Sequence, residues 1–298
     1  MSSQKSPKYV IFDVTGGIGK HIASTAVVSN IKLAYPDSKI VVVAAWPRVF
    51  VNNPDVYRVF GNGELRYFYD DYIKDKEFLF LKSEPYHHTD YIKHERHLID
   101  VWSEQCGVPT VVTSPKLYIN PVEQLLFRSK YVVDNKPILI LQANGGMNLP
   151  YPYSWVRDMP LNFVNSIVNI LKPHFKILHI RTNNQPQYGD GVIGVTSDDI
   201  RELFCVLNLP SKRLLIDSFG QHAVTALGQS ATVLWPINNV KILGYESNNN
   251  IIGNIPSDLQ KPYAYIEEYR LEGVLSDYPY DDKEIFSATE VAEKLLQN

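Results

Sequence analysis

The chain has 298 residues, of which 45% are hydrophobic and 20% are charged, and its formal net charge at pH 7 is −3. A chain of this length exceeds what one hydrophobic core usually serves, so the sequence predicts two domains. The slightly negative charge argues against nucleic acid as the main partner, while still allowing a local basic groove.

Cysteine usage and the pattern of apolar runs predict a cytoplasmic protein. Cys106 and Cys205 are far apart in the sequence, and two isolated thiols fit a reducing compartment better than a disulfide framework. Neither cysteine has the spacing of a structural zinc site. The N-terminal residues lack the apolar core of a signal peptide. No apolar run approaches the roughly 18 residues that cross a bilayer, so no stable membrane span is predicted.

The first half of the chain alternates strands and helices. An apolar strand over residues 9–14 leads through a glycine-rich turn into a helix over 20–34, which Pro36 ends because proline lacks an N–H group. The apolar run over 40–45 has the pattern of a parallel strand covered on both faces. This βαβ unit is followed by a predicted strand over 77–81 and a predicted helix over 90–105.

Residues 126–136 are predicted to link a domain of residues 1–125 to a domain of residues 137–298, because this stretch carries charge and no strand pattern. The alternation then restarts. The predicted strands of the second domain cover 138–141, 177–180, 214–216 and 232–235, and its predicted helices cover 161–172, 198–207, 219–228 and a tail beginning at Ser287. The predicted fold class is α/β, with two Rossmann-like domains.

Each half contains one strand that stops at a polar or glycine-rich turn and opens a helix. In the first half the strand 9–14 runs into Thr15-Gly16-Gly17-Ile18-Gly19-Lys20-His21, and in the second half the strand ending at Ile216 runs into Asp217-Ser218-Phe219-Gly220-Gln221-His222. Open α/β sheets bind ligands at such strand ends. Two of them in two halves predict a ligand held in a cleft between domains.

These two motifs, with the segments around them, resemble the heptosyltransferase-like glycosyltransferases. The N-terminal resemblance rests on Gly17-Ile18-Gly19, Tyr35-Pro36-Asp37 and Asn53-Pro54-Asp55-Val56, and the C-terminal one on Asp217-Ser218, Gln221-His222-Ala223 and Ala226-Leu227-Gly228. The resemblance implies a GT-B architecture, in which two Rossmann-like domains face each other across a cleft. It also implies metal-independent transfer of a sugar from a nucleoside-diphosphate sugar, with no cofactor.

The resemblance also implies roles for individual residues. The family usually has an acidic residue directly after the glycine turn as the base, but this chain has Lys20 there, so the predicted catalytic residues are Asp13, Lys20 and His21. The predicted donor-binding residues are Asn144, Gly145, Arg181, Asp217, Ser218, Phe219 and His222, with Trp155 and Arg157 as further loop candidates. The predicted acceptor-side residues are Gly17, Gly19, Glu84 and Tyr86.

Several of these residues also have a purely structural interpretation. The glycines of the first turn can serve only a tight turn and close packing, Asp217 or Ser218 can cap a helix, and Arg181 can be a surface charge. His87, His88, His94 and His97 form the densest histidine cluster, with His94 and His97 expected on one helix face, but no cysteine or carboxylate completes a ligand set. No metal site is predicted.

Three functions remain open from the sequence. The first is a glycosyltransferase whose acceptor is a glycan, a lipid-linked sugar or a modified DNA base. The second is a phage-type DNA glycosyltransferase that acts on a hydroxymethylated base, a hypothesis that rests on fold analogy. The third is a non-catalytic nucleotide-sugar or glycan-binding protein, for which Lys20 in place of the acid is the motive.

Overall fold

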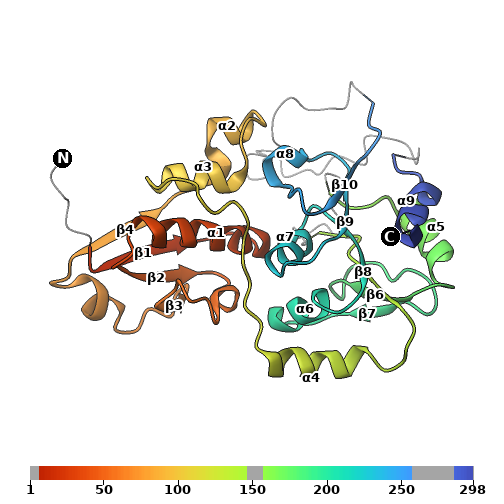
Figure 1. Cartoon of the computed structure of the whole chain (residues 1–298), viewed down its shortest axis with the longest axis horizontal. Coiled ribbons are helices and arrows are strands. Elements are labelled where there is room, and N and C mark those ends of the chain that lie inside the picture. Colours follow the sequence, from red (N-terminus) through yellow and green to blue (C-terminus); the bar gives the residue numbers. More distant parts are fainter. Residues whose placement is uncertain (1–6, 146–156, 257–284, 298) are drawn as a thin grey trace.

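The protein contains two parallel β-sheets, one in each half of the chain (Figure 1). The computed structural model describes residues 7–145, 157–256 and 285–297. The first sheet has the strand order β3-β2-β1-β4, and the second has the order β10-β9-β8-β5-β6-β7. Counted from β5, the second order is the 3-2-1-4-5-6 arrangement of a Rossmann fold, and the first sheet has the 3-2-1-4 part of it. The two Rossmann-like sheets of the predicted α/β fold are therefore present.

The first half is built from four strands and from helices that connect them. The strands are β1 (Tyr9–Val14), β2 (Lys39–Ala44), β3 (Arg58–Gly61) and β4 (Phe78–Lys82). The helices are α1 (Ile18–Ala34), α2 (Thr89–Ile92) and α3 (Leu98–Gln105), with short helical turns η1 (Pro47–Phe50), η2 (Tyr69–Ile73) and η3 (Pro85–His87). The Val-rich strand β2 is buried over all but its first residue, as its apolar run predicts.

The second half is built around six strands. They are β5 (Ile138–Leu141), β6 (Lys176–Ile180), β7 (Ile193–Val195), β8 (Lys212–Ile216), β9 (Thr232–Trp235) and β10 (Asn249–Ile252). The helices are α4 (Pro121–Tyr131), α5 (Leu161–Leu171), α6 (Ile200–Leu207), α7 (Phe219–Ala226), α8 (Val240–Leu243) and α9 (Ala288–Gln297).

Helix α1 is buried over every residue from Lys20 to Ile31. A helix that is covered on all sides must pack against more than one neighbour, and α1 contacts the first sheet, α3 and the helix α7 of the second half (Figure 1). One hydrophobic cluster accordingly contains residues of both halves, for example Phe12 and Trp102 with Val224 and Trp235. The two halves share a core at the junction of α1 and α7.

The predicted helix over 90–105 is wrong as a single element, because the chain forms α2 and α3 with a turn between them. His94 in this turn has a positive φ of 59°, and the His97 ring accepts the Ile99 N–H to begin α3. His94 and His97 therefore do not lie on one helix face. Within the described residues no group of three or more histidine, cysteine, aspartate or glutamate side chains is placed to hold a metal ion.

The stretch predicted as a linker contains most of helix α4, which lies along the outside of α6 (Figure 1). Arg201 of α6 donates to both oxygens of Glu123, at 2.6 and 3.2 Å, and the Tyr131 hydroxyl donates to Glu202 at 2.7 Å. These contacts attach α4 to the second half. The domain boundary itself stays a prediction.

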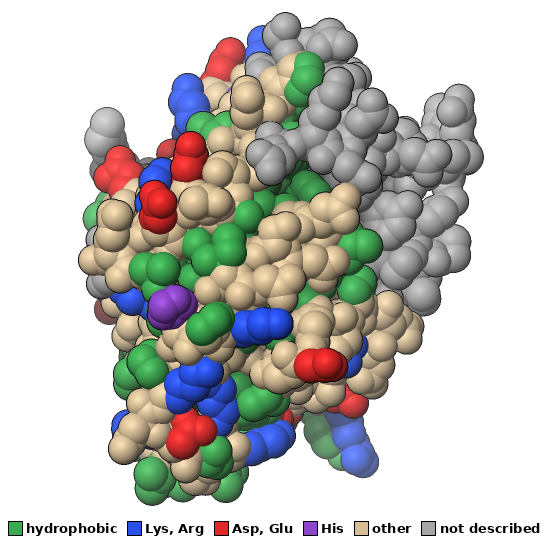
Figure 2. Space-filling view, turned by 90° about the vertical axis from the view of Figure 1, so that its right-hand side faces the viewer, with side chains coloured by type: hydrophobic (Ala, Val, Ile, Leu, Met, Phe, Trp, Pro, Cys, Tyr) green, Lys and Arg blue, Asp and Glu red, His purple; other side chains and the backbone are tan. Residues whose placement is uncertain are grey.

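The surface carries charges of both signs. Figure 2 shows the end of the molecule formed by the second half, where Lys and Arg side chains gather toward the lower part and Asp and Glu side chains lie among and above them. Among residues 7–145, 157–256 and 285–297, no helix combines the length and the hydrophobicity that crossing a bilayer requires.

Candidate functional site

The candidate residues follow the two neighbouring strands in each sheet between which the strand order reverses. In the first sheet β1 and β4 are neighbours, and the turn of Gly17 follows β1 while Glu84 follows β4. In the second sheet β5 and β8 are neighbours, and Asn144 follows β5 while Asp217 follows β8. The carboxyl ends of such strands form the crevice in which α/β proteins bind ligands.

The first turns of α1 and α7 touch each other. A Cβ atom at Gly19 would lie 2.9 Å from Cδ2 of His222 and 3.5 Å from Cα of Phe219. Only glycine allows this approach, because real Cβ contacts are longer. The contact brings the glycine turn and the Asp217-Ser218 turn, which are about 200 residues apart in sequence, into one place.

Neither of these helix N-termini is capped by a side chain. Gly17 and Ser218 are the N-cap residues, both with extended backbone, and neither makes a side-chain capping bond. The Ser218 hydroxyl instead accepts a hydrogen bond from Gln142 Nε2 at 3.2 Å. The side-chain capping interpretation of Ser218 is therefore wrong. Among the described residues, two helix starts without a side-chain cap and without an acidic residue in the first turn favour an anion between them.

Asp217 is buried beside the start of α7. Its Oδ2 atom accepts a hydrogen bond from Asn238 Nδ2 at 2.6 Å. Burial raises the pKa of the Asp217 carboxyl group, while the charge of Arg157 and the hydrogen bonds from Asn238 and Gln221 act in the opposite direction. Asn238 was missed by the sequence analysis, although a polar residue shortly after the strand 232–235 is a usable signal for a site at that sheet edge.

His222 is buried and neutral. Its Nδ1 atom lies 2.8 Å from the Tyr245 hydroxyl, and its ring packs edge-on against that ring with centroids 5.5 Å apart. Burial lowers the pKa of His222 to about 3, with smaller contributions from the charges of His97 and Arg157. A neutral imidazole at this position can accept or donate a hydrogen bond but does not supply positive charge.

Asn144 and Gly145 belong to a hydrogen-bonded loop beside the site. Asn144 Nδ2 donates to Asp158 at 3.1 Å, and the Tyr188 hydroxyl donates to Asn144 Oδ1 at 3.0 Å. The N–H group of Gly145 donates to Asp158 at 2.7 Å, while its carbonyl accepts from Gln185 at 2.5 Å. These bonds fix the loop, and direct donor contact by Asn144 and Gly145 stays a prediction.

Arg157, more than Arg181, is the cation of this region. Arg157 interacts electrostatically with both Asp217 and His222. Arg181 follows β6, which lies on the side of β5 away from β8, and its guanidinium donates to the carbonyl groups of Gln185 and Thr182 at 2.8 and 3.3 Å. Contact of Arg181 with a diphosphate stays a prediction, and Trp155 lies outside the described residues.

Lys20, predicted to be catalytic, and Glu84, predicted on the acceptor side, form an ion pair. Lys20 is buried, and its ammonium group lies 2.5 Å from Glu84 Oε2 and over the rings of Tyr86 and Trp102, at 5.1 and 5.5 Å from their centroids. The other oxygen of Glu84 accepts the Tyr86 N–H at 3.3 Å. The pair joins the helix that follows β1 to the loop that follows β4.

His21 has no exposed surface, and its ring serves the main chain. Nδ1 lies 2.9 Å from the Gly17 carbonyl, and Nε2 lies 3.1 Å from both the Val14 carbonyl and the Ala45 N–H. Burial lowers the pKa of His21, although its main-chain hydrogen bonds raise it. The arrangement holds the turn between β1 and α1 against the end of β2.

Asp13 faces away from α1. In β1 the side chains of Phe12 and Val14 join the core beneath α1, while Ile11 joins a separate cluster on the opposite face. Because side chains alternate along a strand, Asp13 lies on the face of Ile11, where it pairs with Lys82 at 2.9 Å.

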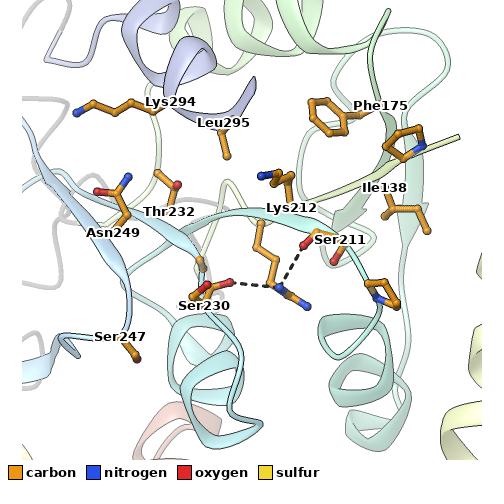
Figure 3. Close-up of a pocket in the computed structure, with 14 residues that line it drawn as sticks. Ile138, Phe175, Ser211, Lys212, Ser230, Thr232, Ser247, Asn249, Lys294 and Leu295 are labelled. Atoms are coloured by element: carbon orange, nitrogen blue, oxygen red, sulfur yellow. Dashed lines mark hydrogen bonds between the residues drawn. The ribbon is translucent and has the colours of Figure 1, made fainter. Parts of the chain in front are cut away.

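A pocket of about 650 Å³ lies at the amino ends of the strands of the second sheet (Figure 3). The residues that begin four strands line it, namely Ile138, Lys212, Thr232 and Asn249, together with residues such as Arg213 and Lys294. Arg213 donates to the carbonyl groups of Ser211 and Ser230, so its guanidinium is part of the wall. The pocket lies at the amino ends of the strands, away from the edge where such sheets bind ligands.

No model of a known protein family matches this chain, and no curated protein matches it. Solved structures do match. The glycosyl transferase family 9 protein from Veillonella parvula DSM 2008 has a TM-score of 0.68 at 16% identity, with 97% of each chain covered. The fold is that of the family 9 glycosyltransferases.

Two heptosyltransferases share this fold. ADP-heptose lps heptosyltransferase II of E. coli has a TM-score of 0.61 at 10% identity, over 84% of this chain and 91% of its own. Heptosyltransferase WaaC of E. coli, solved with ADP, has a TM-score of 0.52 at 11% identity, over 85% of this chain and 96% of its own. Its structure with a fluorinated ADP-heptose analogue has the same TM-score at 12% identity, over 83% and 93%. The resemblance found in the sequence motifs is confirmed at the level of the fold.

Proposed function

We propose that this protein is a glycosyltransferase that moves a sugar from a nucleoside-diphosphate sugar to a hydroxyl acceptor without a metal ion. The observation that carries the proposal is the meeting of two uncapped helix N-termini, those of α1 and α7, at the carboxyl edges of two parallel sheets. Unused N–H groups and the helix dipole stabilise a phosphate anion there. The fold shared with family 9 glycosyltransferases supports the same assignment.

The proposed donor site lies at the start of α7. The N–H groups that begin this helix face the diphosphate, and the positive charge of Arg157 adds to them. Asp217, Ser218, Phe219 and His222 position the nucleotide sugar, and Asn144, Gly145 and Arg181 are further proposed contacts. Because the neighbours with this fold include enzymes solved with ADP and an ADP-heptose analogue, ADP-heptose is the first donor to test.

The proposed chemistry uses position and charge. When the bond between the sugar and the diphosphate breaks, negative charge grows on the leaving phosphate, and fixed N–H dipoles stabilise that charge without having to reorganise. These dipoles take the place that a divalent metal has in other transferases. The acceptor lies between the two halves, on the side of Gly17, Gly19, Glu84 and Tyr86, in the cleft that the GT-B architecture implies.

The test is a panel of nucleotide sugars and nucleoside diphosphates read by thermal shift, with released diphosphate measured in the same wells. A ligand at about 100 times its dissociation constant adds about 2.7 kcal/mol of stability, which raises the melting temperature by several degrees. We expect a shift with one donor class, led by ADP-heptose, together with slow diphosphate release. No shift with any nucleotide contradicts the proposal.

Asp217 provides the matched variant for this panel. Asp217→Asn keeps the size of the side chain and its contact with Asn238, but removes the charge beside α7. We expect diphosphate release to fall by about 100-fold or more if the carboxylate orients donor in the transition state. Unchanged release contradicts the donor-site assignment.

Lys20 supports a second candidate, a non-catalytic nucleotide-sugar-binding protein, because a cation stands where the family has an acid. This candidate predicts a thermal shift without diphosphate release, with or without added nucleophile. The same panel therefore separates the two functions.

A further inference from the structure

At the start of α1 a lysine stands where the resemblance implies a carboxylate, and a carboxylate from the loop after β4 lies beside it. Lys20 occupies the position after the glycine turn, and its ammonium group lies 2.5 Å from a carboxylate oxygen of Glu84, which follows β4. We propose that Glu84 is the general base that takes the proton of the acceptor hydroxyl, and that Lys20 is the residue that positions it. The inference rests on the proposed transferase function.

The surroundings of the pair fix Glu84 in one place. The Lys20 side chain is only 3% exposed, and a buried ammonium group needs a charged partner because its desolvation is costly. The rings of Tyr86 and Trp102 lie beside the ammonium group and limit where it can move. Lys20 therefore holds one carboxylate oxygen of Glu84, and the Tyr86 N–H holds the other.

Glu84 remains able to accept a proton in this arrangement. Its side chain is 30% exposed, so a bound molecule can reach it. A carboxylate oxygen has two lone pairs, and each oxygen of Glu84 has one protein donor in the described structure. Each oxygen can therefore accept a further hydrogen bond from an acceptor hydroxyl.

Glu84 also lies close to the proposed donor site. Gly19, the residue before Lys20, touches His222 of α7. The pKa of Tyr91 is raised by burial first and then by Tyr86 and Asp217, with Arg157 opposing and Glu84 adding. Glu84, Asp217 and Arg157 therefore all lie within electrostatic range of one side chain, that of Tyr91.

The other predicted bases are less suitably placed. Both ring nitrogens of His21 contact main-chain groups. Asp13 lies on the sheet face away from α1 and pairs with Lys82. Lys20 forms the ion pair with Glu84. Of the four side chains, Glu84 alone combines a carboxylate, partial exposure and an ion pair with the residue that follows the α1–α7 contact.

In the proposed step, one bond to C1 of the sugar forms, another breaks and one proton moves. The acceptor oxygen forms a bond to C1 of the sugar as its proton moves to Glu84. The bond between C1 and the phosphate oxygen breaks, and its electron pair leaves with the nucleoside diphosphate, whose charge the α7 N–H groups stabilise. Glu84 later releases the proton to water, which returns the site to its starting state.

The experiment compares a nucleophile that must lose a proton with one that has none to lose. Diphosphate release from the best donor of the panel is measured in water alone and with added sodium azide, for the wild type and for Glu84→Gln. Water needs a base, whereas azide attacks C1 directly. We expect Glu84→Gln to reduce release in water by about 100-fold or more, and to leave azide-dependent release and donor affinity within about threefold of the wild type.

A double variant guards against misfolding. Glu84→Gln leaves the buried ammonium group of Lys20 without its charged partner, so Lys20→Met with Glu84→Gln removes both charges together. This variant should show the same loss in water and the same azide-dependent release. Glu104→Gln, which removes an exposed carboxylate that pairs with Arg96, is the control and should leave both rates unchanged.

Each other outcome overturns the assignment. Release in water that is as fast in Glu84→Gln as in the wild type excludes Glu84 as the base. If Asp13→Asn, measured in the same way, loses release in water instead, the base is Asp13. Equal loss with water and azide means that Glu84 acts on the donor or on folding. A wild type that releases no diphosphate with either nucleophile contradicts the transferase proposal itself.

Discussion

Gly19 allows the two halves of the molecule to approach each other closely. Its missing side chain lets the first turn of α1 lie against His222, with no room for a Cβ atom. Gly17, two residues earlier, has no neighbour within 4 Å of the place where its Cβ would be, and its φ of −78° suits any residue. The two glycines of one turn therefore have different reasons to be glycine.

We expect Gly19→Ser to destabilise the protein by about 1–3 kcal/mol, because the added atoms must push α1 away from α7. Gly17→Ser is the matched control. Serine is a favoured N-cap residue, so this change should leave the stability within roughly 1 kcal/mol of the wild type or increase it. Urea unfolding of both variants measures the difference, and equal midpoints would show that the α1–α7 contact yields easily.

The residues of the site illustrate what sequence reasoning could reach. The motif positions Gly19, Asp217 and His222 were singled out from the sequence, and the structure brings Gly19 into contact with His222. The Lys20–Glu84 pair could not be predicted, because 64 residues separate its members and only the strand order places β4 beside β1. His21 was predicted to be catalytic from its position after the glycine turn. It is buried, and both of its ring nitrogens contact main-chain groups.

At the scale of elements, the strands buried in the sheets were predicted, and of the edge strands only β4 was. The strands over 138–141 and 232–235 were predicted with their observed bounds, since a short apolar run between turns admits few other interpretations. The edge strands β3, β7 and β10 were missed because each is only three or four residues long and lacks a run of buried residues. Helix α4 was missed because its outward face carries the apolar residues Val122, Leu125 and Leu126.

Helix α4 depends on its charged contacts with α6. The Arg201 side chain is 1% exposed, and Glu123 is its only carboxylate partner among the ion pairs of the described residues. We expect Glu123→Gln to destabilise the protein by about 1–3 kcal/mol, because it leaves a buried guanidinium without a counter-charge. Glu104→Gln, at an exposed pair with Arg96, should cost less than about 1 kcal/mol.

The pH dependence of this difference has a definite sign. The hydrogen bond from Arg201 lowers the pKa of Glu123 below its ordinary value of 4.5, although burial acts against it. A depressed carboxylate pKa adds stability above the unfolded-state pKa, and this stability is lost as the pH falls through the folded-state value. The gap between wild type and Glu123→Gln should therefore be full at pH 7 and shrink below about pH 4.5. A gap that is unchanged at pH 3 would contradict the role of the charge.

At the scale of the molecule, one continuous hydrophobic cluster spans both halves. Phe12 and Trp102 of the first half and Val224 and Trp235 of the second belong to one hydrophobic cluster. Interfaces between independent domains are usually more polar, and such domains move relative to each other. The junction of α1 and α7 has the composition of a core instead, and His21 and His222 within it are hydrogen-bonded.

This continuity predicts that the halves unfold together. Separating them exposes apolar side chains of α1, α3 and α7 at a cost of about 25 cal/mol for each Å² uncovered, so neither half is stable with its partner unfolded. We expect one calorimetric transition, in which the calorimetric and van't Hoff enthalpies agree. A nucleoside diphosphate bound at α7 should move the whole transition upward. Two transitions, of which the ligand moves only the one belonging to residues 137–298, would show instead that the halves fold independently and that the shared core contributes little to their cohesion.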